Sequence, residues 1–258
     1  MSEASKKFIG WLFTPLYVVN FISILVIFDP FIRLGFLLGP KKFRLFFDLL
    51  NLALIINFKL IGTKIKFYNC SQLPSDKPLI IISNHQSMYD IPIFSWYLRR
   101  YVPRFISKKE LGSGIPSISF SLRKSYAALI DRSDPKQAIP EIERFAIDLS
   151  KKKHSAVIFP EGTRARDGKL KKFKTAGLKT LLKAMPDAVI VPASIKGSWE
   201  MVRYKLLPVP FGTRIEFRVH TPILRGERSI EDIITEAENI IRADLESLET
   251  MDEKCNIV

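Results

Sequence analysis

The sequence Pro78-Leu-Ile-Ile-Ile-Ser83 runs directly into Asn84-His-Gln-Ser-Met-Tyr-Asp90. The first segment is a short, almost continuous apolar run, which is typical of a strand that is covered on both faces of a sheet. The second segment is polar, and in an open α/β sheet the residues that follow a strand lie where binding sites form. Together the two segments predict an α/β fold with a polar site directly after this strand.

Other short apolar runs follow along the chain and alternate with amphipathic, helix-like stretches. The expected strands are Arg104–Ser107, Ala127–Asp131, Ser155–Phe159, Ala188–Val191 and the half-exposed Thr213–Thr221. The expected helices are one that starts at Asp134-Pro135 with an N-cap and a first-turn proline, Lys174–Ala184 and Ser229–Leu248. This alternation predicts that residues 64–258 form an α/β domain with a mixed, mainly parallel sheet flanked by helices.

The first 63 residues have a different character. Ile9–Phe28 contains no charged side chain, and a helix of this length, at ~1.5 Å per residue, is long enough to cross a bilayer core. A cleaved signal peptide, a single transmembrane span and a buried hairpin of a soluble protein are alternatives. Lys and Arg flank both ends of the segment, which favours a helix that turns near Asp29-Pro30 and returns as Phe31–Ile61. We therefore expect residues 1–63 to form a membrane-anchoring helical hairpin.

The composition narrows the classes of partner. The chain has 40 Lys and Arg against 26 Asp and Glu, a formal net charge of +14, and 47% hydrophobic residues, which excludes intrinsic disorder. A basic, apolar chain usually binds nucleic acid, an anionic membrane or a phosphorylated small molecule. Nucleic-acid binding predicts a basic stripe with interleaved aromatics, whereas the basic residues here gather at loops and beside the apolar segment. No nucleic-acid partner is expected, and no Cys/His cluster indicates zinc.

His85 and Asp90 are the first candidate catalytic pair. On a regular α-helix they would lie about 140° apart, so they meet only if the segment is not one straight helix. A strand-to-helix turn would let Asp90 accept from one ring nitrogen of His85 and leave the other to take a proton from a substrate. The alternative is a capping or core histidine with an N-cap aspartate before Ile91-Pro92, and the spacing alone leaves both open.

Two other polar segments follow expected strands. In Phe159-Pro-Glu-Gly-Thr-Arg164, Gly162 permits a close backbone approach and Arg164 offers a planar fork for a phosphate. The alternative is a solvated basic loop, and no Walker or G-x-G-x-x-G pattern supports a nucleotide site. Lys108-Lys109-Glu110 and Asp131-Arg132 either add cations to the same site or belong to the surface.

In their order and spacing, five segments resemble those of the membrane-bound glycerolipid acyltransferases, the 1-acylglycerol-3-phosphate acyltransferase family. They are NHQSMYD (84–90), KKEL (108–111), LIDRSD (129–134), FPEGTR (159–164) and VPASI (191–195). The H-x4-D pattern alone is weak, but the FPEGTR block and the Val-Pro block after it make the resemblance specific. It covers Pro78 to Ile195, and the apolar hairpin is similar to the family's membrane anchor.

The resemblance implies transfer of a fatty acyl group from acyl-CoA or an acyl carrier protein to the sn-2 hydroxyl of lysophosphatidate. The product is phosphatidate, in phospholipid biosynthesis, and neither a metal nor a bound cofactor is required. His85 would be the general base and Asp90 its orienting partner. The acceptor would be bound by Glu161, Gly162 and Arg164, with further phosphate contacts from Arg132 and Lys109 (or Lys108), and Val191 and Pro192 would shape the acyl-binding region.

The chain departs from the family in the second block, where a glycine and a phenylalanine are usual. The corresponding residues here are Tyr126 and Leu129. Added bulk near the acceptor region narrows the site or changes the acceptor without removing a catalytic group. The departure puts the choice of substrate in doubt more than the reaction.

Alternative functions are acylation of another lysophospholipid, or lipid binding without catalysis by a membrane protein of the same fold. The bilayer is an expected partner in each case, and the active site is expected at the cytoplasmic face. This would be the inner membrane of a bacterium or the endoplasmic reticulum of a eukaryote. The last four residues, Cys255-Asn-Ile-Val258, formally fit a prenylation box, but valine is not a usual final residue and we take the match as chance.

Overall fold

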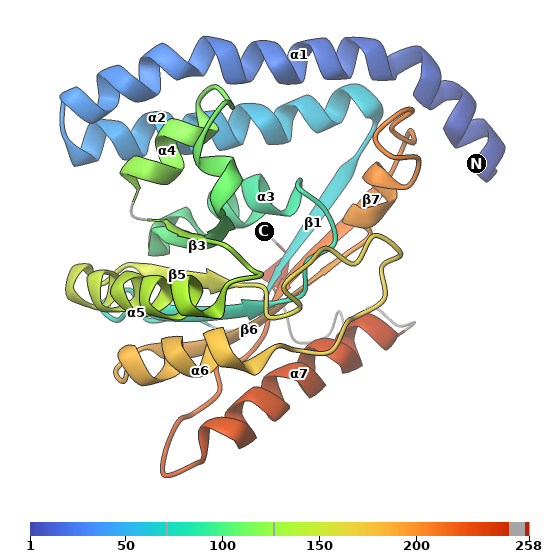
Figure 1. Cartoon of the computed structure of the whole chain (residues 1–258). Helices are drawn as coiled ribbons and strands as arrows, with labels where there is room; N and C mark the ends of the chain where they lie inside the picture. The colour runs from blue at the N-terminus through green and yellow to red at the C-terminus, as the bar shows by residue number, and fades with distance from the viewer. Residues whose placement is uncertain (71, 126, 248–255, 258) are drawn as a thin grey trace.

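In the computed structural model, a mixed eight-stranded sheet lies between a long helical hairpin and a layer of helices (Figure 1). The structure describes residues 1–70, 72–125, 127–247 and 256–257. The strand order is β4-β3-β5-β2-β6-β7-β1-β8. The strands are β1 (Lys64–Asn69), β2 (Leu79–Ser83), β3 (Pro103–Lys108), β4 (Ala128–Ile130), β5 (Ser155–Ile158), β6 (Val189–Lys196), β7 (Arg214–Val219) and β8 (Asn256–Ile257).

The central strand is β2, which pairs in parallel with β5 on one side and β6 on the other. All of its residues are buried. Ile80 and Ile82 face the core beneath the helices of one layer, whereas Leu79 and Ile81 face the core on the hairpin side. The double burial explains why the sequence of this strand is continuously apolar instead of alternating.

The remaining pairings confirm the predicted mixed, mainly parallel sheet. β3 pairs in parallel with β5 and β4 with β3, while β7 runs antiparallel to β6 and parallel to β1. β8 is antiparallel to β1. Sequence analysis did not identify β1 or β8 as strands, because β1 has lysines at two of its six positions and β8 has two residues.

The helices follow the predicted boundaries closely where capping signals exist. Asp134 accepts hydrogen bonds from the backbone N–H groups of Lys136 and Gln137, and Ser229 accepts from that of Asp232. Leu248, the expected last residue of the final helix, lies outside the described residues. The helices are α1 (Glu3–Leu37), α2 (Pro40–Asn57), α3 (Asp90–Tyr97), α4 (Ile118–Lys124), α5 (Pro135–Lys152), α6 (Thr175–Ala184) and α7 (Ile230–Glu246), with 3₁₀ turns η1 (Phe58–Ile61), η2 (Arg99–Tyr101), η3 (Lys109–Gly112) and η4 (Ser198–Val202).

The hairpin is present, but the expected turn near Asp29-Pro30 is wrong. α1 continues through Pro30, and the chain reverses at Leu38-Gly39 instead. Gly39 has a φ of 102°, in the region that favours glycine, and Pro40 occupies the first position of α2, where its fixed φ suits a helix start. Asp29 stays helical and accepts a 2.6 Å hydrogen bond from the backbone N–H of Ser117, which ties α1 to the segment before α4.

α1 packs on the α/β body near both of its ends. Near its start, Thr14 Oγ1 accepts a 2.9 Å hydrogen bond from the backbone N–H of Val209. A Cβ at Gly10 would lie 2.4 Å from the Val209 carbonyl oxygen, so this close approach requires a glycine. Towards its end, the hydroxyl of Ser117 donates to the carbonyl of Leu25 at 2.6 Å. The helix is therefore held along the body and does not project away from it (Figure 1).

The opposite side of α1 is an exposed apolar face. Its members recur every three or four residues, and the helix is long and apolar enough to cross a membrane by length and composition. An uninterrupted apolar face of this length is a surface for membrane association. The exposed apolar residues of α1 are Phe8, Trp11, Leu12, Leu16, Val19, Ile22, Val26, Ile27, Phe31, Leu34, Phe36 and Leu37.

A buried polar cluster fastens α7 to the sheet. The carboxylate of Asp244 on α7 forms an ion pair with Arg218 of β7 at 3.1 Å and accepts a short hydrogen bond from the hydroxyl of Ser194 on β6. Arg218 is 4% exposed, although the alternation of β7 predicted an outward side chain there. The carboxylate on α7 compensates the buried guanidinium, which explains why an arginine is tolerated inside.

We expect Asp244→Ala to lower the free energy of unfolding by about 3–5 kcal/mol, because it leaves a buried guanidinium without its carboxylate. The measurement is denaturant unfolding in detergent. Glu238→Ala on the same helix is the matched control, since it removes only the more exposed pair with Arg242 and should cost less than about 1 kcal/mol. Equal losses in the two variants would contradict the role given to Asp244.

Candidate functional site

The sequence-predicted site residues gather at one edge of the sheet. β4, β3, β5 and β2 are neighbours and run parallel, so their carboxyl ends lie side by side. Each of these ends leads into one predicted segment. The segments are Asp131-Arg132 after β4, Lys108-Lys109 at the end of β3, Phe159–Arg164 after β5 and Asn84–Asp90 after β2.

His85 and Asp90 are in direct contact. The Nδ1 atom of His85 lies 2.8 Å from the Oδ2 atom of Asp90. Residues 84–89 form an irregular turn and α3 begins at Asp90, so the pair is not confined to one straight helix. This is the geometry expected for a catalytic pair, in which a strand-to-helix turn lets Asp90 accept a hydrogen bond from one ring nitrogen of His85. Asp90 is completely buried and His85 is 6% exposed, so the pair is largely shielded from water.

The carboxylate of Asp90 collects four further hydrogen bonds. Its Oδ2 atom accepts from the backbone N–H groups of Gln86 at 2.8 Å and Ser87 at 3.0 Å. Its Oδ1 atom accepts from the hydroxyls of Ser87 at 3.1 Å and of Ser198, on η4. An acceptor with this many donors is fixed in direction, so it orients the imidazole. Sequence analysis missed Ser198, because no spacing signal connects it to a motif more than a hundred residues away.

The ring of His85 rests on an aromatic platform. Phe159, which directly follows β5, stacks on the imidazole with centroids 4.2 Å apart and planes inclined by 16°. The backbone of His85 is also fixed, because its carbonyl accepts from the N–H of Ala165 at 2.7 Å. The Nδ1 atom faces Asp90, so the Nε2 atom is the ring nitrogen available to a ligand.

Glu161 joins the two central loops of the site. Its Oε1 atom accepts from the backbone N–H of His85 at 2.7 Å and its Oε2 atom accepts from that of Lys171 at 3.0 Å. Burial raises the pKa of this carboxyl, and the two backbone donors oppose that shift. Glu161 is a predicted acceptor-binding residue, but in this structure both of its oxygens are used to position backbone.

Two arginines lie near each other at the mouth of the site. Arg132 donates to the carbonyl of Gly162 at 2.7 Å. Partial desolvation and then the nearby charge of Arg164 lower the pKa of Arg132, and partial desolvation likewise lowers that of Arg164. The negative charge of Asp90 raises the pKa of Arg164, so the Arg164 guanidinium lies near the buried His85–Asp90 pair. Two like charges that lie close together create a positive potential that favours an anion.

The other predicted residues lie at the margins of the site. Lys108 forms an ion pair with Glu110 at 2.8 Å, so Lys109 is the better candidate of the two for a ligand. Val191 is buried in β6 beside Ile81 of β2 and belongs to the core on the hairpin side. Pro192 is also buried, but it pairs with Ile82, whose side chain faces the opposite core.

Of the two residues that depart from the family pattern, the structure describes only Leu129. Leu129 is half-buried in β4, and its side chain is close to Gly112, where an added Cβ would lie 2.9 Å from the Leu129 Cδ1 atom. Tyr126 lies outside the described residues, as do Cys255 and Val258 of the carboxyl-terminal box.

The other two histidines offer no competing catalytic pair. Ser194, His220 and Asp244 contain the residue types of a triad, but the serine hydroxyl lies between the other two, 2.9 Å from His220 Nε2. Ser194 is also 1% exposed, so a substrate does not reach it. His154 precedes β5, at the opposite edge of the sheet. The described residues contain no group of three or more His, Cys, Asp or Glu that could hold a metal ion.

Known proteins match this chain over the region that contains these segments. A family model described as Acyltransferase matches residues 64–196. Over 140 residues the chain is 31% identical to the chloroplastic 1-acyl-sn-glycerol-3-phosphate acyltransferase LPAT1 of Arabidopsis thaliana, covering 54% of this chain and 38% of that protein. Over 134 residues it is 36% identical to the 1-acyl-sn-glycerol-3-phosphate acyltransferase of Helicobacter pylori, covering 49% and 54%. The alignments therefore span roughly a third to a half of these relatives.

A solved structure shares the fold. The crystal structure of the 1-acyl-sn-glycerophosphate acyltransferase PlsC from Thermotoga maritima superposes with a TM-score of 0.71 at 23% sequence identity. The match covers 95% of this chain and 97% of that one, so it includes the helical hairpin as well as the sheet.

The hydrogen bond to Asp90 predicts the tautomer of His85. We expect the neutral ring to carry its proton on Nδ1, with Nε2 unprotonated, because the buried carboxylate needs a donor. Nitrogen-15 NMR of labelled histidine measures this directly, and His154→Gln with His220→Gln leaves one signal to assign. Asp90→Asn should abolish the preference. A proton found on Nε2 in the unsubstituted pair would contradict this geometry.

Proposed function

Given that this chain belongs to the acyltransferase family, we propose that it transfers a fatty acyl group from a thioester to the sn-2 hydroxyl of lysophosphatidate, giving phosphatidate. The observation that carries the proposal is the His85–Asp90 contact at 2.8 Å, beside a pair of arginines at the same sheet edge. Relatives from plants and bacteria are named as 1-acyl-sn-glycerol-3-phosphate acyltransferases, which supports the same acceptor.

The reaction needs one base and no covalent enzyme intermediate, because a thioester is already activated. The Nε2 atom of His85 takes the proton of the acceptor hydroxyl as its oxygen attacks the thioester carbonyl carbon. The carbon–sulfur bond then breaks, and the imidazolium returns the proton to the departing thiolate, which leaves as a thiol. Asp90 stabilises the imidazolium formed between these steps through its hydrogen bond to Nδ1.

The acceptor is oriented through its phosphate. Arg164 and Arg132 supply planar donors for a phosphate monoester, and Lys109 adds a cation at the end of β3. Gly162 has a φ of 70°, so the loop that carries Arg164 adopts a backbone conformation that favours glycine. Glu161 acts as a positioning residue, since it holds the loops that carry His85 and Arg164 together.

The acyl donor is the thioester of coenzyme A or of acyl carrier protein, and the chemistry calls for no metal or resident cofactor. The basic segment after Arg164 is the surface that suits either donor, because both carry phosphate groups. Its exposed cations are Arg166, Lys169, Lys171 and Lys172. Another lysophospholipid as acceptor is the second candidate; the paired arginines favour lysophosphatidate, whose monoester carries the larger charge.

The exposed face of α1 sets the proposed orientation at the membrane. Gly10 and Asp29 both contact the α/β body, and the helix between them is ~29 Å long at 1.5 Å per residue. A bilayer core of about 30 Å therefore cannot surround this part of the helix while the body stays attached. We infer that α1 lies along one leaflet with its apolar face immersed, and that the active site faces the cytoplasm. The membrane is the inner membrane in a bacterium or the endoplasmic reticulum in a eukaryote.

His85→Ala should lower kcat by about 10²–10⁴-fold, because it removes the general base. Binding of lysophosphatidate should change little, since the base acts in the transition state. The assay uses the detergent-solubilised chain with lysophosphatidate and a long-chain acyl-CoA or acyl carrier protein thioester. His154→Gln, at the opposite edge, is the control and should retain activity. A His85→Ala rate within a few-fold of the unsubstituted chain would remove His85 from the base role.

Arg164→Ala should lower kcat/KM for lysophosphatidate by about 10–100-fold, which corresponds to the loss of one charged hydrogen bond. The KM for lysophosphatidate should rise while that for the thioester changes less. Lys172→Ala removes an exposed charge from the same loop and serves as the matched control, with an effect of a few-fold at most. A change confined to the thioester KM would assign Arg164 to the donor instead.

A further inference from the structure

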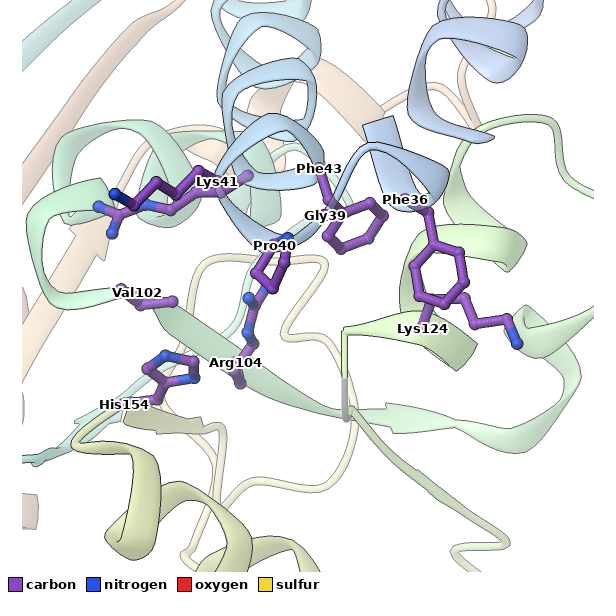
Figure 2. Close-up of a pocket in the computed structure, with 10 residues that line it drawn as sticks. Phe36, Gly39, Pro40, Lys41, Phe43, Val102, Arg104, Lys124 and His154 are labelled. Atoms are coloured by element: carbon purple, nitrogen blue, oxygen red, sulfur yellow. The ribbon is translucent and has the colours of Figure 1, made fainter. Parts of the chain in front are cut away.

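A second charged cavity lies at the other end of the same strands. It has a volume of about 280 Å³ and is bounded by the elbow between α1 and α2 and by the amino-terminal ends of β3 and β5 (Figure 2). The proposed active site follows the carboxyl-terminal ends of these strands. Because β3 has six residues at about 3.3 Å each, the two sites are separated by roughly 20 Å of sheet.

The ionisable residues that line the cavity are all of the basic types, and four of the five are lysine or arginine. They come from four separate elements, and of the described lining residues none is acidic. The carboxylate of Asp48, which is not part of the lining, lies 3.7 Å from the Nε atom of Arg44. The basic lining residues are Lys41 and Arg44 of α2, Arg104 of β3, Lys124 of α4 and His154 before β5.

The cations around the cavity affect the pKa of His154. Burial and the nearby cations, Arg104 first among them, lower the pKa of His154 to about 4. Arg104 is 9% exposed, so its charge acts in a region with little water to screen it. Figure 2 shows the Arg104 side chain extending from β3 toward Pro40 at the elbow. The cavity thus concentrates positive potential at one point under the hairpin turn.

The start of α2 contributes to the same potential. Pro40 and Lys41, the first two residues of this helix, line the cavity, and the N-cap position is Gly39, which has no side chain to cap the helix. The first amide groups of a helix have no partners within it, and the helix dipole makes this end positive. Pro40 has no N–H group, so the uncapped start of this 18-residue helix offers its first amide donor at Lys41, in addition to the positive end of its dipole.

The rim of the cavity is apolar and belongs to the membrane-facing surface. Phe36 and Phe43 line it, and their rings meet edge to face with centroids 5.9 Å apart. Leu37 and Leu38, at the elbow beside the cavity, are 80% and 60% exposed. These side chains continue the apolar face of α1 to the cavity opening. A ligand that matches both parts has an anionic group and an apolar tail.

We propose that this cavity binds the phosphate of an anionic membrane phospholipid, whose acyl chains leave along the exposed elbow. The bound lipid fixes the elbow end of the hairpin at the head-group level. The site is separate from the one that we assign to lysophosphatidate and does not depend on that assignment.

Lys41 and Lys42 allow a matched test, because both are exposed and adjacent on α2 but only Lys41 lines the cavity. Binding of the full-length chain is measured to phosphatidylcholine vesicles with and without a minor fraction of phosphatidylglycerol. We expect Lys41→Gln to weaken binding to the anionic vesicles by about 10–100-fold, the loss of a charged hydrogen bond to phosphate. Lys42→Gln should weaken it by about five-fold or less, as expected for one charge near an anionic surface.

Two further experiments distinguish a specific lipid site from other causes of weaker binding to anionic vesicles. Lys124→Gln, an exposed residue on α4, should reproduce the loss, and neither Lys41→Gln nor Lys124→Gln should alter binding to pure phosphatidylcholine. Equal losses for Lys41→Gln and Lys42→Gln would mean diffuse surface charge and would overturn the proposal. Displacement of the chain from anionic vesicles by millimolar inorganic phosphate, dependent on Lys41, would make the ligand a soluble anion and overturn the lipid assignment.

Discussion

The buried carboxylate of Asp90 is the constraint around which the proposed active site is built. A carboxylate without solvent has to be compensated by donors, and Asp90 obtains them from the ring of His85, from the turn after β2 and from Ser198 after β6. These donors follow two neighbouring strands, β2 and β6, so their hydrogen bonds to one carboxylate join the segments after both strands. The imidazole of His85 is held by its hydrogen bond to this carboxylate and by the stacked ring of Phe159.

The strand order then decides which charges surround this pair. The segments after β4, β3 and β5 reach the same edge as His85 only because these strands are parallel neighbours. Arg132 and Arg164 come from segments about thirty residues apart, and desolvation together with the nearby charge of Arg164 lowers the pKa of Arg132. Such an arrangement is unfavourable in the free protein and becomes favourable when an anion lies between the two cations. The fold therefore holds two cations of the proposed acceptor site close together before a ligand binds.

The hairpin connects this chemistry to the membrane through the two sides of one helix. Its inner side needs small or hydrogen-bonding residues, such as Gly10 and Thr14, because it touches the backbone of the body. Its outer side is free to be apolar throughout. The contacts of the inner side fix the position of the α/β body relative to the apolar outer side of α1. Membrane attachment and the position of the sheet edge are thus set by a single rigid element.

The sequence by itself determined the parts of this protein that depend on local pattern. The apolar run 79–82 indicated a doubly covered strand, the Asp134 cap marked a helix start, and the polar segments after the strands carried the family resemblance. Only the tertiary structure decided the rest. α1 continues through Pro30, where Asp29 accepts a hydrogen bond from the distant Ser117, and Arg218 is buried because a distant helix supplies its carboxylate. Ser198 and the elbow cavity likewise combine residues far apart in sequence, and local patterns hold no information about such contacts.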